Sequence, residues 1–281
     1  MPNKNLIWLA SYPKSGNTWF RIILSNLLSD NENQIDINNL ERTPIASSRD
    51  LFDEHAPICA SELTHREIDL YRPQVYRSLS NSQNKTAFLK VHDSYHKNYK
   101  QKAIFPTDVS IGAIYIVRNP LDIVASFSNH LNRNIDSTIK LMNSPDFAFA
   151  EGLKGLPQQL RQQIGSWSGH VQSWISQTEI PICIVRYEDM LNDTFTTLKK
   201  VLSFCKLNNS DGEIIEAIKK SSFEHIKKQE ATKGFKERPL HTPSFFRKGK
   251  HGNYKHELSH IQINKIIEYH GEIMEQLQYL P

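Results

Sequence analysis

"LIWLASYPKSGNTWFRIILSNLL", residues 6–28, is the stretch that decides the fold of this chain. The short apolar run at residues 5–10 predicts a buried strand. Residues 18–28 then predict a helix whose apolar side chains share one face: Trp19, Ile22, Ile23 and Leu27. A strand, a tight loop and a helix N-terminus in succession form an arrangement that binds phosphate, because free N–H groups and the positive helix end both face the loop. The stretch therefore predicts a loop that holds a phosphate or a sulfate.

The order of residues in this loop differs from that of a P-loop ATPase. The ATPase pattern GxxxxGK[ST] places its lysine after the second glycine. Here Lys14 comes before Gly16, and no first glycine is present. An ordinary capped helix start remains the alternative explanation for the loop taken alone.

Three later apolar runs resemble the first one. They lie at residues 86–95, 111–120 and 181–191, are continuous rather than alternating, and are separated by helical stretches. That pattern is typical of a parallel sheet covered on both faces. The chain shows no internal repeat, low-complexity linker or clear boundary, so we expect a single α/β domain over residues 1–281, with a central parallel sheet flanked by helices. Thr64 followed by Glu67 also predicts a capping box at the start of a helix.

The composition excludes several classes of protein. A net charge of +4 and a pI near 8.8, without long Lys/Arg stripes, argue against a nucleic-acid partner and suit a small anionic ligand. Three cysteines without a CxxC argue against a disulfide framework or a zinc site, and for a reducing compartment. No signal peptide or membrane span is apparent. We therefore expect a cytoplasmic protein with no membrane partner and no metal.

Two further stretches carry candidate ligand-binding residues. In "YIVRNPLDIVASFSNH" a strand ends on Arg118, and Ser126 follows eight residues later. In "FFRKGKHGNYKHE", Arg247 and Lys248 supply two cations, and Gly249 lets the backbone approach a ligand closely. Each stretch on its own could be a surface charge or a solvated basic turn.

Taken together and in this order, the three stretches resemble the family of cytosolic-type sulfotransferases that use 3′-phosphoadenosine 5′-phosphosulfate (PAPS). "YPKSGNTW" is similar to the family's 5′-phosphosulfate loop, "IYIVRNPLDIVASF" to its 3′-phosphate motif, and "FFRKGKHGNYK" to its RKG loop. The resemblance extends from about residue 5 to residue 270. It implies a P-loop-kinase-like core with a PAPS-binding loop, PAPS as sulfuryl donor and PAP, the desulfated nucleotide, as product.

The resemblance also implies roles for individual residues. Those that would hold the 5′-phosphosulfate are Lys14, Ser15, Gly16, Asn17 and Thr18. Those that would hold the 3′-phosphate are Arg118, Ser126, Arg247, Lys248 and Gly249. Those that would contact the adenine or the nucleoside are Trp19, Tyr187, Ser221, Ser222 and Phe223, with Ser221 in place of the more usual threonine.

The catalytic stretch is "FLKVHDSY". Residues two apart in a strand face the same way, so Lys90 and His92 should point into one site. A neutral histidine is suited to take the proton of an attacking acceptor, and a lysine can stabilise charge on the leaving oxygen. The resemblance places the catalytic histidine at His92, with Lys14 and Lys90 on the leaving side. Asp93 should face away from His92, so we expect no catalytic dyad.

The remaining histidines in and near this part of the chain carry no such signal. We expect His96, His130 and His170 to be ordinary surface or core residues.

Two departures from the family pattern bear on partners. In "KHELSHIQIN", Ser259, His260 and Asn264 replace Thr, Val and Glu of the family's KxxxTVxxxE dimer motif, so the oligomeric state is left open. "HDSY" differs from the pair that often follows the family histidine, which suggests a bacterial branch with a different acceptor. We expect a small-molecule acceptor, an alcohol, phenol or amine, with a carbohydrate or a protein tyrosine as alternatives.

Two other functions share parts of this pattern. A small-molecule or nucleotide kinase would have the same strand–loop–helix core, but should show a Walker-type loop and a strand-end carboxylate for Mg²⁺. A non-catalytic nucleotide-binding module would have the ligand grip without the Lys90 and His92 pair. Both remain alternatives at this point.

Overall fold

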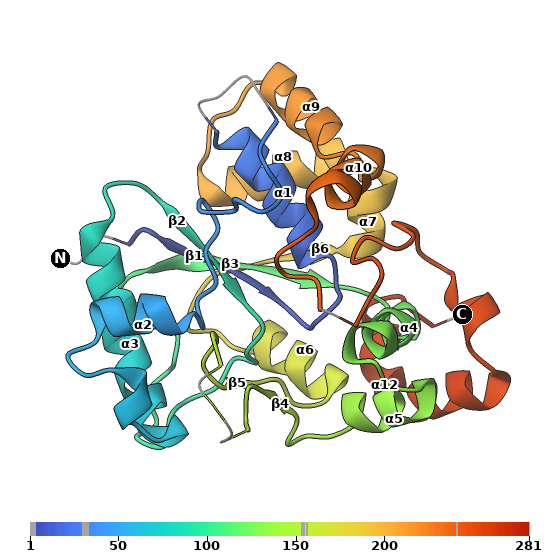
Figure 1. Cartoon of the computed structure of the whole chain (residues 1–281), viewed down its shortest axis with the longest axis horizontal. Coiled ribbons are helices and arrows are strands. Elements are labelled where there is room, and N and C mark those ends of the chain that lie inside the picture. The colour runs from blue at the N-terminus through green and yellow to red at the C-terminus, as the bar shows by residue number, and fades with distance from the viewer. Residues whose placement is uncertain (1–3, 30–33, 153–154, 156, 240, 281) are drawn as a thin grey trace. The chain divides into compact units, whose positions relative to one another are not determined.

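The computed structural model describes residues 4–29, 34–152, 155, 157–239 and 241–280 (Figure 1). The chain divides into two compact units. Unit 1 comprises Met1–Tyr12, Pro44–Tyr115 and Asn143–Ile184, and unit 2 comprises Pro13–Thr43, Ile116–Met142 and Val185–Pro281. The single domain over residues 1–281 stays a prediction.

The main sheet has four strands in the order β2-β1-β3-β6 (Figure 1). Their bounds are β1 Leu6–Ser11, β2 Ala87–Val91, β3 Ser110–Val117 and β6 Ile182–Arg186. Strand β1 is buried along its whole length and pairs in parallel with β2, so that Leu6 lies opposite Ala87 and Ala10 opposite Val91. A strand that is buried on both faces has apolar residues along its whole length, and this is why the apolar run in the sequence predicts β1. The prediction of an α/β fold with a central parallel sheet flanked by helices is confirmed.

Unit 1 packs its helices around an aromatic core. Besides its strands of the main sheet, its elements are α2 Arg49–His55, the 3-10 helix Ala60–Glu62, α3 His65–Ser82, the hairpin of β4 Ala148–Phe149 with β5 Gln162–Gln163, and α6 Trp167–Ile175. Trp8 of β1 contacts Tyr76 of α3 and Phe105, and Phe105 contacts Trp174 of α6. Helices α3 and α6 therefore share one core with the first strand. The predicted capping box is present at the start of α3.

Unit 2 is mostly helical. Its helices are α1 Asn17–Leu27, α4 Pro120–Leu131, α5 Ile135–Met142, α7 Tyr187–Asn192, α8 Thr194–Cys205, α9 Asp211–Lys220, α10 Phe223–Lys233, α11 Tyr254–Glu257 and α12 His260–Gln276. Helix α1 packs against α9, and α4 packs against α5, α11 and α12. A second hydrophobic cluster joins Ile22 of α1 to Ile226 of α10 and to Phe235 and Phe246, with Trp19 packed against it.

Several element boundaries differ from those that the sequence predicts, and two of the differences change how a segment is read. Strand β2 ends at Val91, so His92 lies just beyond the strand rather than inside it. Strand β6 ends at Arg186, so the second half of the apolar run at residues 181–191 belongs to helix α7 rather than to a strand. The first turn of α7 holds Glu188 and Asp189, whose negative charge favours a helix N-terminus. Among the residues described, no helix is both long enough and apolar enough to cross a bilayer.

Candidate active site

The loop between β1 and α1 has a backbone that few residues can adopt. Lys14 and Gly16 both have positive φ, 69° and 99°. A Cβ atom at Gly16 would lie 2.4 Å from Cδ2 of Tyr187, the first residue of α7. Glycine is therefore required at residue 16 for its backbone conformation and because an aromatic ring lies against it.

The same loop carries polar groups that the described residues do not satisfy. Ser15 is fully buried, yet its Oγ has no hydrogen-bond partner among them. The N-terminus of α1 has no capping side chain and no acidic residue in its first turn. Buried polar groups are rarely left without a partner, so an unpaired hydroxyl at a helix N-terminus fits an anionic ligand. Of the other loop residues predicted to bind, Asn17 is buried and Thr18 is half-buried.

Arg118 adds a cation to this loop. It follows β3, and its Nη1 and Nη2 donate to the carbonyl oxygens of Lys14, 3.2 Å, and Lys250, 3.1 Å. Its guanidinium lies 4.3 Å from the centre of the Tyr187 ring. Its Nε is buried and has no partner among the described residues. The Nε–H group of Arg118 is thus left for a ligand, and the guanidinium is held in place by the two carbonyl oxygens and the Tyr187 ring.

Arg118 lies at the junction of β3 with α4, and local contacts explain why the helix starts directly after it. The Asn119 side chain accepts from the Leu121 N–H at 2.9 Å as N-cap of α4, and Pro120 takes the first helical position. The Asn119 N–H donates to Oε1 of Glu188 at 3.0 Å. A cap, a proline and a side-chain acceptor together explain the sharp strand-to-helix change.

The residues predicted to contact adenine also lie together. Nε1 of Trp19 donates to the Ser221 carbonyl oxygen at 2.9 Å, and the Trp19 ring meets the Tyr187 ring edge-on at 6.1 Å. Ser221 is fully buried and its Oγ accepts from Nδ2 of Asn26 at 3.0 Å. Nζ of Lys14 lies 4.0 Å over the ring of Phe245. Burial raises the pKa of Tyr187, against the opposing effect of Arg118, so this tyrosine stays protonated at neutral pH.

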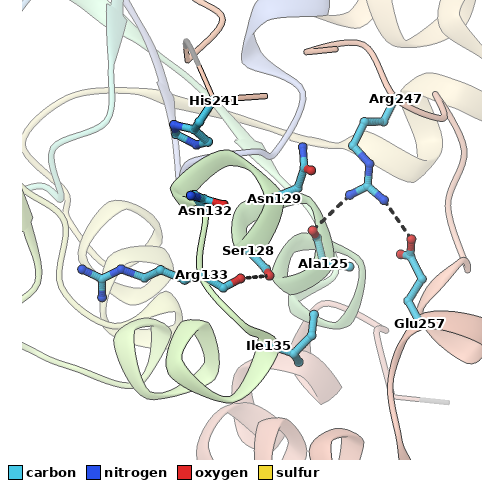
Figure 2. Close-up of a pocket in the computed structure, with 9 residues that line it drawn as sticks. All are labelled: Ala125, Ser128, Asn129, Asn132, Arg133, Ile135, His241, Arg247 and Glu257. Atoms are coloured by element: carbon cyan, nitrogen blue, oxygen red, sulfur yellow. Dashed lines mark hydrogen bonds and ion pairs between the residues drawn. The ribbon is translucent and has the colours of Figure 1, made fainter. Parts of the chain in front are cut away.

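The predicted RKG loop is anchored to α4. Nη1 of Arg247 donates to the carbonyl oxygen of Ala125 at 3.1 Å (Figure 2). Ser126, the next residue in the chain, is half-buried. Gly249 has φ 59°, and a Cβ there would lie 2.5 Å from the ring of Phe223. These contacts connect the RKG loop to α4 and to the start of α10.

An acidic residue that the sequence analysis missed also lies at this loop. Oε1 of Glu257 accepts from Nη2 of Arg247 at 3.0 Å and from Nζ of Lys248 at 2.7 Å. Figure 2 shows Arg247 between Ala125 and Glu257. All three residues line an open polar pocket of about 430 Å³. Glu257 belongs to "KHELSHIQIN", the stretch that was compared with the family's dimer motif. Nothing in that stretch predicted an ion pair with Arg247 or Lys248.

His92 lies just beyond β2 in unit 1, half-buried. Its Nδ1 is 2.8 Å from the carbonyl oxygen of Ser11, at the end of β1. A carbonyl oxygen only accepts, so Nδ1 carries the proton of the neutral ring and Nε2 is the basic nitrogen. Lys90, on β2, is buried, and its backbone N–H and C=O bond to Pro44 and Ala46.

Asp93 is committed to an ion pair away from the proposed chemistry. Its two carboxylate oxygens accept from Arg72 of α3 at 2.9 and 2.8 Å, and both side chains are fully buried. Burial alone would raise the pKa of Asp93, but the Arg72 guanidinium outweighs it and holds that pKa below its usual value.

Of the three histidines expected to be ordinary, His170 is in contact with the candidate catalytic residue. It is fully buried, and its Nε2 lies 3.1 Å from the carbonyl oxygen of His92. His96 bonds through Nδ1 to the Ser94 carbonyl oxygen at 2.9 Å, and the His130 carbonyl accepts from His241 at 3.0 Å. Within the described ranges, no group of three or more His, Cys, Asp or Glu side chains is placed to hold a metal ion.

Comparison with known proteins places the chain in a family. The model of the sulfotransferase domain matches residues 4–278. A flavonol 3-sulfotransferase of Flaveria bidentis is 25% identical over 274 residues, which cover 93% of this chain and 79% of that enzyme. Two solved structures share the fold. A mouse sulfotransferase in complex with PAP has a TM-score of 0.60 at 21% identity, covering 97% of this chain and 85% of its own. A retinol dehydratase in complex with retinol and PAP has a TM-score of 0.59 at 17% identity, covering 97% of this chain and 82% of its own. Because the family model spans nearly the whole sequence, the chain belongs to the sulfotransferase domain family.

Proposed function

We propose that this protein transfers the sulfuryl group of PAPS to a hydroxyl or an amine of a small-molecule acceptor. Membership of the sulfotransferase domain family supports the reaction class. The observation that carries the proposal is the pair of buried, unsatisfied donors at the loop, Ser15 Oγ and Arg118 Nε. Unpaired buried donors beside a cation are costly unless an anion binds there.

The residues of unit 2 fit the two ends of the donor. Lys14 and the loop from Ser15 to Thr18 would hold the 5′-phosphosulfate, because they combine a cation, an unpaired hydroxyl and a helix N-terminus. The residues proposed for the 3′-phosphate are Arg118, Ser126, Arg247, Lys248 and Gly249. Those proposed for the adenine and its ribose are Trp19, Tyr187, Ser221, Ser222 and Phe223, of which Trp19, Tyr187 and Ser221 are in mutual contact. Gly16 and Gly249 each place backbone against an aromatic ring, which leaves no room for a Cβ.

The proposed chemistry assigns roles to three side chains. When bound, PAPS supplies an activated sulfuryl group, and the sulfur–oxygen bond to its phosphate breaks as the acceptor oxygen or nitrogen bonds to sulfur. His92 takes the acceptor's proton at Nε2, the nitrogen left basic by the Nδ1 bond to Ser11. Lys14 and Lys90 stabilise the negative charge that remains on the leaving side. An in-line course of this transfer belongs to the same proposal.

The acceptor is proposed to be a small alcohol, phenol or amine. The names of the relatives support this, because one acts on a flavonol and another on a 3-alpha-hydroxysteroid. A cytoplasmic location and a single sulfotransferase domain over residues 1–281 complete the proposal.

A ligand-preference experiment tests the proposal without knowledge of the acceptor. Thermal unfolding is followed with PAP, with ATP and with 5′-AMP, each with and without Mg²⁺. PAP carries a 3′-phosphate that the other two lack, so a cationic pocket for that group should discriminate by about 2–5 kcal/mol, or about 1.5 to 3.5 orders of magnitude in affinity. We expect clear stabilisation by PAP without Mg²⁺, and little by the others even with it.

Two variants make the test specific. Arg118→Ala should weaken PAP and remove most of its advantage over 5′-AMP. Lys265→Ala, which removes an exposed cation of α12, serves as the control and should leave the preference unchanged. Stronger stabilisation by Mg-ATP than by PAP would contradict the proposal and favour a kinase.

A further inference from the structure

One face of helix α6 holds the main chain of the segment that carries His92. His170, Ser173 and Trp174 lie at i, i+3 and i+4, which places them on the same side of the helix. Their polar atoms meet three main-chain groups: the His92 carbonyl at 3.1 Å, the Tyr95 N–H at 2.9 Å and the Asp93 carbonyl at 3.0 Å. The helix is itself fixed at its start, because the Ser166 side chain accepts from the Gly169 N–H.

The proton on His170 can be assigned from these contacts. Its Nε2 faces a carbonyl oxygen, which only accepts, so Nε2 is the donor. Nδ1 must then accept, and it lies 2.8 Å from the hydroxyl of Tyr115 on β3. Complete burial lowers the pKa of His170 to about 4, so the ring is neutral at neutral pH and both its nitrogens are used.

The His170 ring is also held by packing. It lies edge-on to Tyr12 at 5.4 Å and stacks on Tyr115 at 5.7 Å. A ring fixed by two hydrogen bonds and two aromatic neighbours is a rigid support for the atom that it contacts. That atom is the carbonyl oxygen of His92, in the residue whose imidazole donates to Ser11.

We propose that His170 is a positioning residue for His92: by holding the His92 carbonyl, it keeps the imidazole bonded to Ser11 through Nδ1 and Nε2 in the basic form. The effect on turnover rests on the proposed role of His92 as the base. Which nitrogen of a neutral imidazole carries the proton depends on the hydrogen bond that the other makes. A main-chain shift that loosens the Ser11 contact would therefore let the second tautomer form, with Nε2 already protonated and unable to accept.

Two substitutions at residue 170 separate the hydrogen bond from the packing. His170→Phe keeps a planar ring between the two tyrosines and removes the donor. His170→Gln places an amide N–H near the position of Nε2 and keeps the donor. Ser173→Ala is the matched control, because it removes a contact from the same face of α6 to the same segment, but to residue 95.

Two readouts are needed, one of which does not involve turnover. Nitrogen-15 NMR of the imidazoles reports the tautomer of His92 in the free protein, and steady-state kinetics with PAPS reports kcat and KM. In the wild type and in Ser173→Ala, His92 should carry its proton on Nδ1. In His170→Phe the His92 signal should become that of a tautomer mixture, and kcat should fall by about 10- to 100-fold, the scale of a small misplacement of a catalytic group. The acceptor KM and the PAP affinity should stay within about threefold of wild type. His170→Gln should restore the Nδ1–H tautomer and most of kcat.

The outcomes are distinct. A folded His170→Phe protein with an unchanged His92 tautomer would overturn the proposal, and so would a loss of kcat that the glutamine variant does not restore. A shifted tautomer with unchanged kcat would support the positioning of His92 and instead refute His92 as the base. If His170→Phe does not fold, His170→Asn, whose amide is too short to reach the His92 carbonyl, takes its place in the same comparison.

Discussion

The imidazole of His92 has one nitrogen committed to the Ser11 carbonyl oxygen, and this decides what the other can do. A proton on Nδ1 leaves the lone pair of the neutral ring on Nε2, which can take a proton from an acceptor. A general base contributes about 10²- to 10⁴-fold, so His92→Ala should lower turnover by two or more orders of magnitude. PAP affinity should change little, because the proposed nucleotide ligands are other residues. Single-turnover kinetics, where chemistry limits the rate, checks the first part, and PAP titration checks the second.

His96 supplies a matched control for this prediction. It lies four residues further on, in the segment that follows β2, and bonds through Nδ1 to the Ser94 carbonyl oxygen. His96 is half-buried and its ring bonds within its own segment, so His96→Ala should leave turnover within about threefold of wild type even if it lowers stability. If His92→Ala kept more than about a third of wild-type turnover, His92 would lose the role of base.

At the scale of elements, the RKG loop meets an acidic partner supplied by α11. Glu257 accepts from both Arg247 and Lys248, the two cations proposed for the 3′-phosphate. All three side chains are partly exposed, so these pairs add at most about 1 kcal/mol each to stability. A 3′-phosphate that binds these cations must displace the carboxylate or share them with it, and two anions close together repel each other.

Glu257→Gln should therefore strengthen PAP binding. The amide keeps the shape of the side chain and removes its charge, and we expect PAP affinity to rise by about 3- to 10-fold, the size of one screened charge contact. Calorimetric titration measures the change. Binding of 5′-AMP, which lacks the 3′-phosphate, should not respond. Weaker PAP binding in this variant would mean that Glu257 orients the loop rather than competing with the ligand.

Elements with a strong local signal were predictable, and contacts between distant residues were not. The apolar run before the loop and the Thr64–Glu67 capping box each mark their element through neighbours in sequence, and both are present. The end of β2 at Val91 was missed, because strand length is set by the pairing partner. His170 bonds to a residue 78 positions earlier in the chain. Glu257 pairs with Arg247, a cation of the RKG motif, and that motif gives no sign of an acidic partner. Such partners depend on the tertiary fold and leave no periodic pattern.

At the scale of the whole molecule, two buried histidines link stability to pH. His170 lies in unit 1 and His270 in unit 2, and burial lowers the pKa of each to about 4 from an ordinary value of 6.5. In the unfolded chain both bind a proton below about pH 6.5, whereas in the folded protein neither does until about pH 4. The unfolded state binds more protons in this window, so stability rises with pH across it. Acidification from pH 6.5 to 5.5 should therefore destabilise the protein through the histidines. The carboxylates of lowered pKa, such as Asp93 and Glu67, add to the slope only nearer their ordinary values of 3.8 and 4.5, where the unfolded chain takes up their protons.

Urea unfolding at half-unit steps between pH 7.5 and 4.5 measures this effect, and the slope is taken between pH 6.5 and 5.5, above the range in which the unfolded carboxylates bind protons. Each histidine contributes a slope of up to about 1.4 kcal/mol per pH unit, so the two together should give a slope of up to about 2.7. His270→Gln removes one of the two titrations from the C-terminal helix α12, away from the proposed catalytic residues. It should reduce that slope by about half, whatever its effect on the absolute free energy of unfolding. The slope is the diagnostic quantity, because a cavity or a lost contact shifts stability equally at every pH. The free energy of unfolding could stay constant from pH 7 to 4.5, or His270→Gln could leave the slope unchanged. Either result would show that burial does not lower the pKa of these imidazoles.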